Sequence, residues 1–186
     1  MSTKNDSPNL IWVDCEMTGL DLNKDVLVEI AVLVTDSELN ILGEGIDLVI
    51  KASEDQIKGM NEFVTNMHTE SGLITEIPKG IEASLAEEAI IAYLEKYAPG
   101  AGKSPLAGNS VGTDRAFIAR DMPLLNAYLH YRTIDVSSIK ELARRWYPRV
   151  YFAAPKKTGN HRALGDIRDS IEELEYYRKA IFIPNN

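Results

Sequence analysis

The chain has 186 residues, of which 45% are hydrophobic and 26% are charged, with a net charge of −8 at pH 7. These values suit one globular domain and exclude a disordered or fibrous chain. The negative charge opposes the binding of a long polyanion through phosphate contacts, so a short nucleic acid is easier to reconcile with this sequence than a long one.

The chain ends and the single cysteine indicate a compartment. Residues 1–9 form a short polar segment without the apolar stretch of a secretory signal, residues 10–182 form the predicted single domain, and residues 183–186 form a tail. No run of 18 apolar residues suggests a membrane span. Cys15 lies in an apolar run and cannot form an intramolecular disulfide, so we expect a protein of the reducing cytoplasm that contacts no membrane.

The first fifty residues predict three strands, Leu10 to Glu16, Val26 to Val34 and Ile41 to Ile50. The last two are rich in valine, isoleucine and leucine, as strands are. Short connections between sequential strands predict an antiparallel meander. In the first strand, the period of two places Asp14 and Glu16 side by side on one face.

Helices dominate the rest of the chain. Apolar residues such as Leu85 and Tyr93 recur at helical spacing before Pro99 ends that helix, and Thr113 and Ser137 are each suited to cap a later one. The last helix carries an apolar stripe with Asp166 at its edge. The expected elements are helices over about 84–97, 113–122, 137–146 and 162–180, with strands at 105–108 and 131–136.

The sharpest local feature is Asp14-Cys15-Glu16 at the end of an otherwise apolar strand. Two carboxylates that point the same way repel each other unless a cation neutralises them. Hard oxygen ligands of this kind select Mg²⁺ or Mn²⁺. An isolated Asp-x-Glu pair is more often two solvated residues in a turn, so this pattern gains weight only in combination with other residues.

Three later residues supply that combination. Asp114 follows a glycine-rich turn at a predicted helix start, where an acidic residue also complements the helix dipole. His161 precedes the last helix, and Asp166 lies in its first turns. A neutral imidazole near pH 7 is well suited to take a proton from water. Taken singly, Asp114 could be a simple helix-end charge and His161 a surface residue.

Together these five residues, in the order Asp-x-Glu, Asp and His-x4-Asp, resemble the pattern of the DEDDh exonucleases. A closer similarity, to the oligoribonuclease family, covers essentially the whole chain. It is carried by residues 12–20, 108–110, 130–132, 135–137, 140–146 and the segment around His161. The resemblance implies an α/β fold of the ribonuclease-H-like type, with a mixed sheet that contains an antiparallel three-strand meander and is flanked by helices.

The resemblance also implies roles for the five residues. Asp14, Glu16, Asp114 and Asp166 occupy the positions that hold two divalent cations, Mg²⁺ or Mn²⁺, and His161 occupies the position of the general base. The implied activity is 3′→5′ hydrolysis of very short single-stranded RNA, especially dinucleotides, to 5′-mononucleotides. The alternatives are a DEDDh exonuclease acting on longer DNA or RNA 3′ ends, and an inactive nucleic-acid-binding module.

A second group of residues is implied to bind the substrate. Leu20 would wedge between bases, and Phe63 would stack on one, although related family members can carry tryptophan at that position. Ordinary packing, capping or strand roles are the alternatives for this group. The other residues implied to line the cleft are His68, Ser110 and Ser137, with Tyr131 and Arg132 supplied by the second subunit of a homodimer.

Overall fold

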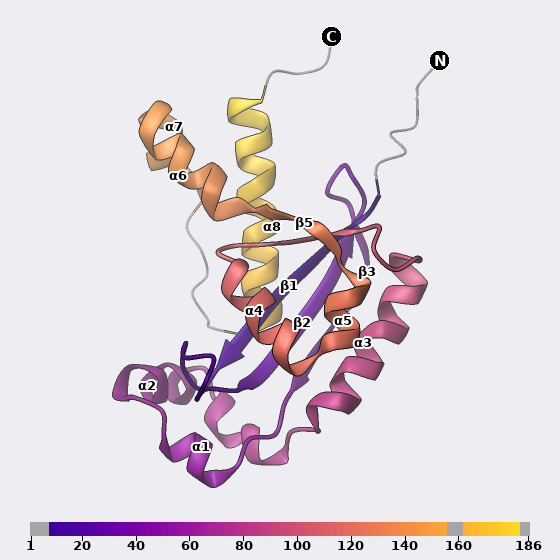
Figure 1. Cartoon of the computed structure of the whole chain (residues 1–186). Helices are drawn as coiled ribbons and strands as arrows, with labels where there is room; N and C mark the ends of the chain where they lie inside the picture. Colours follow the sequence, from indigo (N-terminus) through magenta and orange to yellow (C-terminus); the bar gives the residue numbers. More distant parts are fainter. Residues whose placement is uncertain (1–7, 156–161, 183–186) are drawn as a thin grey trace.

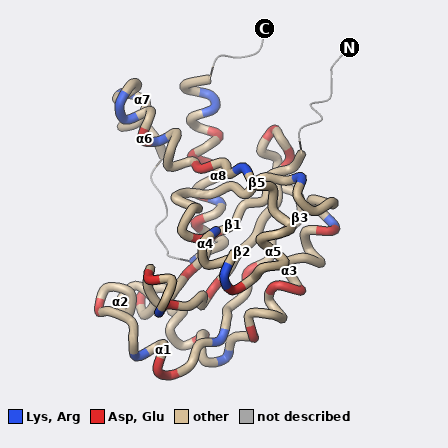
Figure 2. Tube along the Cα trace, viewed as in Figure 1, with Lys and Arg blue, Asp and Glu red and all other residues tan. Residues whose placement is uncertain are grey.

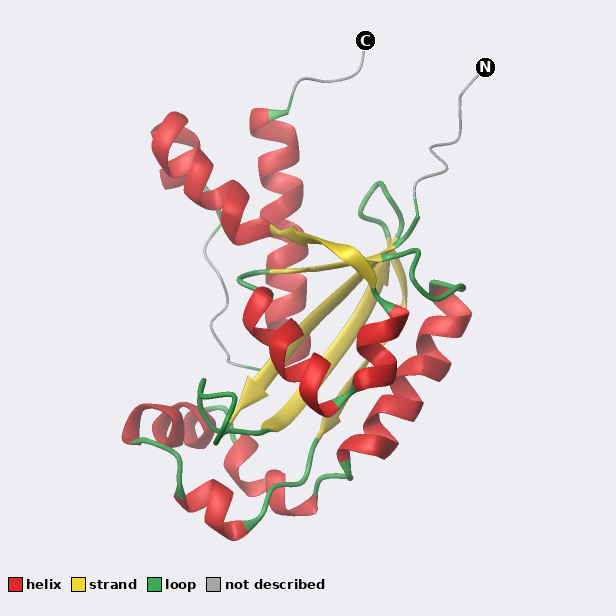
Figure 3. Ribbon diagram, viewed as in Figure 1, coloured by secondary structure: helices red, strands yellow, loops and turns green. Residues whose placement is uncertain are grey.

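A five-stranded mixed sheet forms the centre of the protein in a computed structural model that describes residues 8–155 and 162–182 (Figures 1 and 3). The strand order is β3-β2-β1-β4-β5. The expected antiparallel meander is confirmed, because β1 pairs with β2 and β2 with β3 in antiparallel register, whereas β4 and β5 run parallel to β1. The strands are β1 (Leu10–Met17), β2 (Leu27–Thr35), β3 (Ile41–Val49), β4 (Pro105–Gly108) and β5 (His130–Asp135).

Helices cover both faces of this sheet, which gives the three-layer arrangement seen in Figure 1. One face packs against α3 (Ala83–Tyr97), α4 (Gly112–Asp121) and α5 (Pro123–Tyr128), and the other packs against α6 (Val136–Trp146) and α8 (Ala163–Ile181). The shorter elements are α1 (Glu54–Lys58), α2 (Glu62–Glu70), η1 (Leu73–Thr75) and η2 (Ile77–Lys79) between β3 and α3, and α7 (Pro148–Phe152) after α6.

Side chains along β1 point alternately to the two faces of the sheet, so they belong to two different parts of the core. Ile11 and Val13 pack with the α3–α5 layer, and Trp12 packs with the α8 layer. All nine residues of β2 are buried, because this strand lies between two others and both of its faces are covered. Residues 10–17 and 27–35 therefore form the buried centre of the molecule.

Three local expectations differ from the structure. The buried stripe of α3 runs through Ala86, Ile90 and Leu94, whereas Leu85 is exposed. Both of the predicted helix caps are wrong: α4 begins at Gly112 without a side-chain cap. For α6 the cap is Asp135, whose carboxylate accepts a hydrogen bond from the Ser137 backbone, so Ser137 lies inside the helix.

Charged residues of both signs are distributed along the trace (Figure 2). Basic residues gather on the arm formed by α6 and α7, which starts at the sheet and extends outward from it in Figure 1. No helix within residues 8–155 and 162–182 combines the length and the apolar character that crossing a membrane requires.

Candidate active site

Two carboxylates lie on the face of the sheet that α8 covers. Asp14 and Glu16 alternate with Cys15 along β1, and Trp12 on the same face is fully buried. Asp14 is half-buried, and Glu16 keeps only 9% of its surface exposed. The central strand therefore carries a pair of acids into a largely water-excluded part of the molecule.

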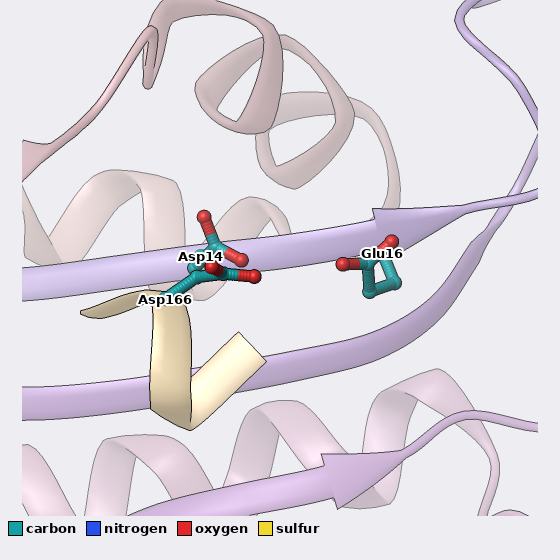
Figure 4. Close-up of side chains that lie close together, drawn as sticks. All are labelled: Asp14, Glu16 and Asp166. Carbon is teal, nitrogen blue, oxygen red and sulfur yellow. The ribbon is translucent and has the colours of Figure 1, made fainter. Parts of the chain in front are cut away.

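A third carboxylate reaches this pair from α8. Asp166 lies in the first turn of that helix, which packs on β1 and β2. One oxygen atom from each of Asp14, Glu16 and Asp166 lies within 4.8 Å of the others (Figure 4). The fold thus joins residues that are about 150 positions apart in the sequence into one cluster of oxygen atoms.

This cluster carries an electrostatic cost that a cation would relieve. Burial raises the pKa of Glu16 to about 8, and the negative charges of Glu29, Asp166 and Asp114 act in the same direction, whereas Arg162 lowers it. A bound divalent ion favours the ionised carboxylates and reverses this balance. Three hard oxygen donors at this spacing fit a divalent metal ion.

The fourth predicted ligand, Asp114, approaches β1 from the opposite layer. It lies in the first turn of α4, is buried, and accepts a hydrogen bond of 2.9 Å from the backbone N–H of Cys15. Burial raises its pKa to about 6. Asp114 is thus attached to the backbone between Asp14 and Glu16, but it is not one of the three carboxylates that cluster within 4.8 Å.

Ser110 and Ser137 both donate hydrogen bonds to Asp135, which was not one of the predicted site residues. The Asp135 carboxylate accepts hydrogen bonds from the Ser110 N–H at 3.0 Å, the Ser137 N–H at 2.9 Å and the Ser137 hydroxyl at 2.6 Å. Ser110 has a left-handed backbone with φ of 54°, which few residues other than glycine adopt. Its strained turn is therefore fixed to the start of α6 at the ends of β4 and β5.

His68 lies beside Glu16 rather than on an open surface. It is fully buried, its Nε2 is 2.9 Å from the Met17 carbonyl oxygen, and its Nδ1 is 3.9 Å from a Glu16 carboxylate oxygen. The Nδ1 atom is buried and has no hydrogen-bond partner within residues 8–155 and 162–182. In this conformation His68 is packed behind Met17 and Glu16 of β1. Its predicted contact with substrate stays a prediction.

Leu20 and Phe63 are both presented to solvent, with 75% and 76% of their surfaces exposed. Leu20 lies in the loop between β1 and β2. The buried carboxylate of Asp25 orders this loop by accepting hydrogen bonds from the Thr18 hydroxyl at 3.1 Å and the Asp21 N–H at 2.9 Å. Both apolar side chains are thus free to meet another molecule.

The remaining predicted residues lie at an edge of the sheet or outside the described ranges. Tyr131 and Arg132 are exposed on β5, the edge strand, and the Arg132 guanidinium lies 5.4 Å from the Tyr131 ring centroid. His161 falls in the segment 156–161, which the structure does not describe. Its predicted role as general base therefore stays a prediction.

Sequence reasoning also missed Glu29, which lies in β2 opposite Glu16 and is fully buried. The signal was available, because a single acidic residue inside the apolar run of β2 is unusual, and charged residues are almost never fully buried unless they are paired.

Comparison with known proteins defines the class of this site. The family model described as exonuclease matches residues 11–174. Oligoribonucleases from two bacteria are 61% (Rhodococcus jostii) and 60% (Streptomyces coelicolor) identical, each over 94% of this chain and 88% of the relative. That of Cutibacterium acnes is 57% identical over 95% of this chain and 87% of the relative. The chain belongs to the oligoribonuclease family of exonucleases.

Solved structures agree with the fold. A zinc-bound complex of E. coli exonuclease I with single-stranded DNA matches with a TM-score of 0.72 at 14% identity, covering 94% of this chain and 41% of that one. The exonuclease I of Methylocaldum szegediense matches with a TM-score of 0.68 at 19% identity and covers the same shares. The chain spans about two fifths of these proteins. The predicted ribonuclease-H-like α/β fold and the predicted phosphodiester hydrolase are confirmed.

Proposed function

We propose that the protein is a 3′→5′ exoribonuclease that hydrolyses very short single-stranded RNA, especially dinucleotides, to 5′-mononucleotides. The observation that carries this proposal is the cluster of Asp14, Glu16 and Asp166 within 4.8 Å, in a chain closely similar to named oligoribonucleases. The site requires divalent cations, and we infer two, Mg²⁺ or Mn²⁺, held by these three residues together with Asp114. The protein would work in the cytoplasm.

The bound ions would lower the pKa of an attacking water and stabilise charge on the phosphate and on the leaving 3′ oxygen. The residues of the chain supply the rest. Asp14 and Glu16 stay fixed because they belong to the central strand, and Asp166 because α8 packs on that strand. His161 would accept the proton of the water.

Selection of short substrates follows from exposed apolar side chains and from charge. Leu20 would wedge between two bases and Phe63 would stack on one, since a base face gains free energy from apolar and aromatic contact. Ser110, Ser137 and His68 would line the rest of the cleft. A protein of net charge −8 has little to attract a long strand, whereas a dinucleotide needs few phosphate contacts.

A homodimer would complete the site, with Tyr131 and Arg132 arriving from the second subunit. Two features support this inference. Both residues project from an exposed edge strand, and the adjoining arm of α6 and α7 exposes the large apolar side chains of Trp146 and Phe152. Exposed apolar surface of this kind marks interaction sites. Analytical ultracentrifugation showing a fully active monomer would overturn the dimer.

The activity is tested with a 5′-labelled RNA dinucleotide, because a 3′→5′ exonuclease must release a labelled 5′-mononucleotide from it. We expect this product with Mg²⁺ or Mn²⁺ and none after addition of a chelator. Asp166→Asn should abolish the product, whereas Asp169→Asn, three residues along the same helix, should retain it. Product formation in chelator, or equal activity of Asp166→Asn and wild type, would contradict the proposal.

A further inference from the structure

A buried ion pair holds the beginning of α8. Glu29 on β2 is fully buried, and its carboxylate accepts hydrogen bonds from Arg162 Nε at 2.8 Å and from the backbone N–H of Ala163 at 3.1 Å. A second guanidinium nitrogen, Nη2, lies 2.7 Å from the same carboxylate. Arg162 is the N-cap of α8 but provides no side-chain cap. Glu29 therefore satisfies the helix N-terminus from a different element.

This ion pair stands next to the carboxylate cluster. Glu29 is the direct register partner of Glu16 across the β1–β2 ladder. Arg162 precedes Asp166 by four residues, which is about one turn of helix. The position of Asp166 relative to the β1 carboxylates is therefore set through one short path, from β2 through Glu29 to the first turn of α8.

Packing alone does not explain why a charged pair occupies this place. A fully buried carboxylate is retained only when it is paired and hydrogen-bonded, and an apolar pair of similar volume is often at least as stable. Arg162 also reaches Glu76 at 3.0 Å, between η1 and η2, so its guanidinium is held from two sides. What the pair adds is a fixed direction and distance for the helix start, because a guanidinium presents its N–H groups in a rigid plane.

We propose that Glu29 and Arg162 form a positioning clamp that sets where Asp166 stands relative to the β1 carboxylates, and thereby sets the affinity of the cluster for divalent cations. Because the bound cations act on the reacting phosphate, loosening the clamp should lower kcat more than it changes KM. The inference rests on the proposed function only in requiring that the cluster binds a divalent cation.

Two substitutions that remove charges of opposite sign separate a clamp from a simple electrostatic effect. Glu29→Gln removes a negative charge beside the cluster, and Arg162→Met removes a positive one. Charge alone predicts weaker cation binding in the first variant and tighter binding in the second. A clamp predicts weaker binding in both, and a combined variant no worse than the weaker single one, because the two residues act as a unit.

The experiment measures Mn²⁺ binding by isothermal titration calorimetry without substrate, and kcat and KM on an RNA dinucleotide. We expect Glu29→Gln and Arg162→Met each to raise the Kd for Mn²⁺ by about tenfold or more and to lower kcat, with KM little changed. Glu38→Gln, which removes the exposed partner of Arg178 near the other end of α8, is the matched control and should behave as wild type. Circular dichroism checks the fold. If Arg162→Met does not fold, Arg162→Lys replaces it, since it keeps the charge and loses the rigid guanidinium.

Wild-type affinity in Glu29→Gln, or unchanged or tighter Mn²⁺ binding in the Arg162 variant, would overturn the clamp. A wild type that binds Mn²⁺ but leaves RNA dinucleotides intact would overturn the proposed function alone, because the calorimetric comparison still decides the clamp. A wild type that binds no Mn²⁺ would overturn both.

Discussion

Replacing Glu16 by glutamine should stabilise the metal-free protein at neutral pH. Burial and neighbouring carboxylates raise the pKa of Glu16 from 4.5 to about 8. Such a group holds its proton in the native state and releases it on unfolding, so its contribution to stability falls as the pH rises from 4.5 to about 8. One pH unit corresponds to about 1.4 kcal/mol, so the loss at pH 7 is roughly 3 kcal/mol. The neutral amide of Glu16→Gln avoids this loss.

Urea unfolding followed by circular dichroism, in EDTA and at one protein concentration, measures the effect at about pH 5.5, 7 and 8.5. The advantage of Glu16→Gln over wild type should grow with pH, and Mn²⁺ should stabilise wild type more than the variant. Glu141→Gln is the surface control, because its arginine neighbours hold the pKa of Glu141 at about 2, below this range. A Glu16→Gln variant that is less stable than wild type at every pH would refute the reasoning.

Three further substitutions separate roles within the site. Asp114→Asn should keep the fold, because its amide oxygen can still accept the Cys15 hydrogen bond. Its kcat should fall more than about 100-fold, because the substitution removes a charged metal ligand. An active variant would remove Asp114 from the metal site. His161→Ala should keep Mn²⁺ and substrate binding while kcat falls by about 10²–10⁴, and near-normal turnover would mean that another base acts. Leu20→Ala should raise KM for dinucleotides about tenfold without changing Tm. Leu124 is an exposed leucine of α5, and Leu124→Ala should change neither quantity. Equal effects of the two substitutions would reject the role of Leu20 as a wedge between bases.

Periodic elements were predictable because their pattern is local. The β1 to β3 meander followed from short connections between apolar runs, and the last helix from an apolar stripe, of which Ile167, Ile171 and Leu174 are buried. The stripe of α3 was wrong because two apolar rows lie on that helix. Only packing against β2 and β3 decides that Ile90, and not Leu85, faces the core.

Only the local part of the candidate site was predictable from the sequence. Asp14 and Glu16 share a face by strand geometry alone, and the structure adds Asp166 to them. The approach of Asp114 from the opposite layer could not be derived from spacing, because it depends on β4 ending before Cys15 and leaving that N–H unpaired. The pairing of Glu29 with Arg162 spans 133 positions and required the tertiary structure.

Initial rates of hydrolysis of 5′-labelled RNA strands, from two to about twenty nucleotides in length, test the central claim most directly. Each length is measured with Mg²⁺, with Mn²⁺ and with a chelator. A carboxylate metal site that serves very short RNA predicts the highest rate for dinucleotides, a steep fall with length and no cleavage in chelator. A metal-dependent rate that rises or stays level with length would contradict it and would identify an exonuclease for longer 3′ ends.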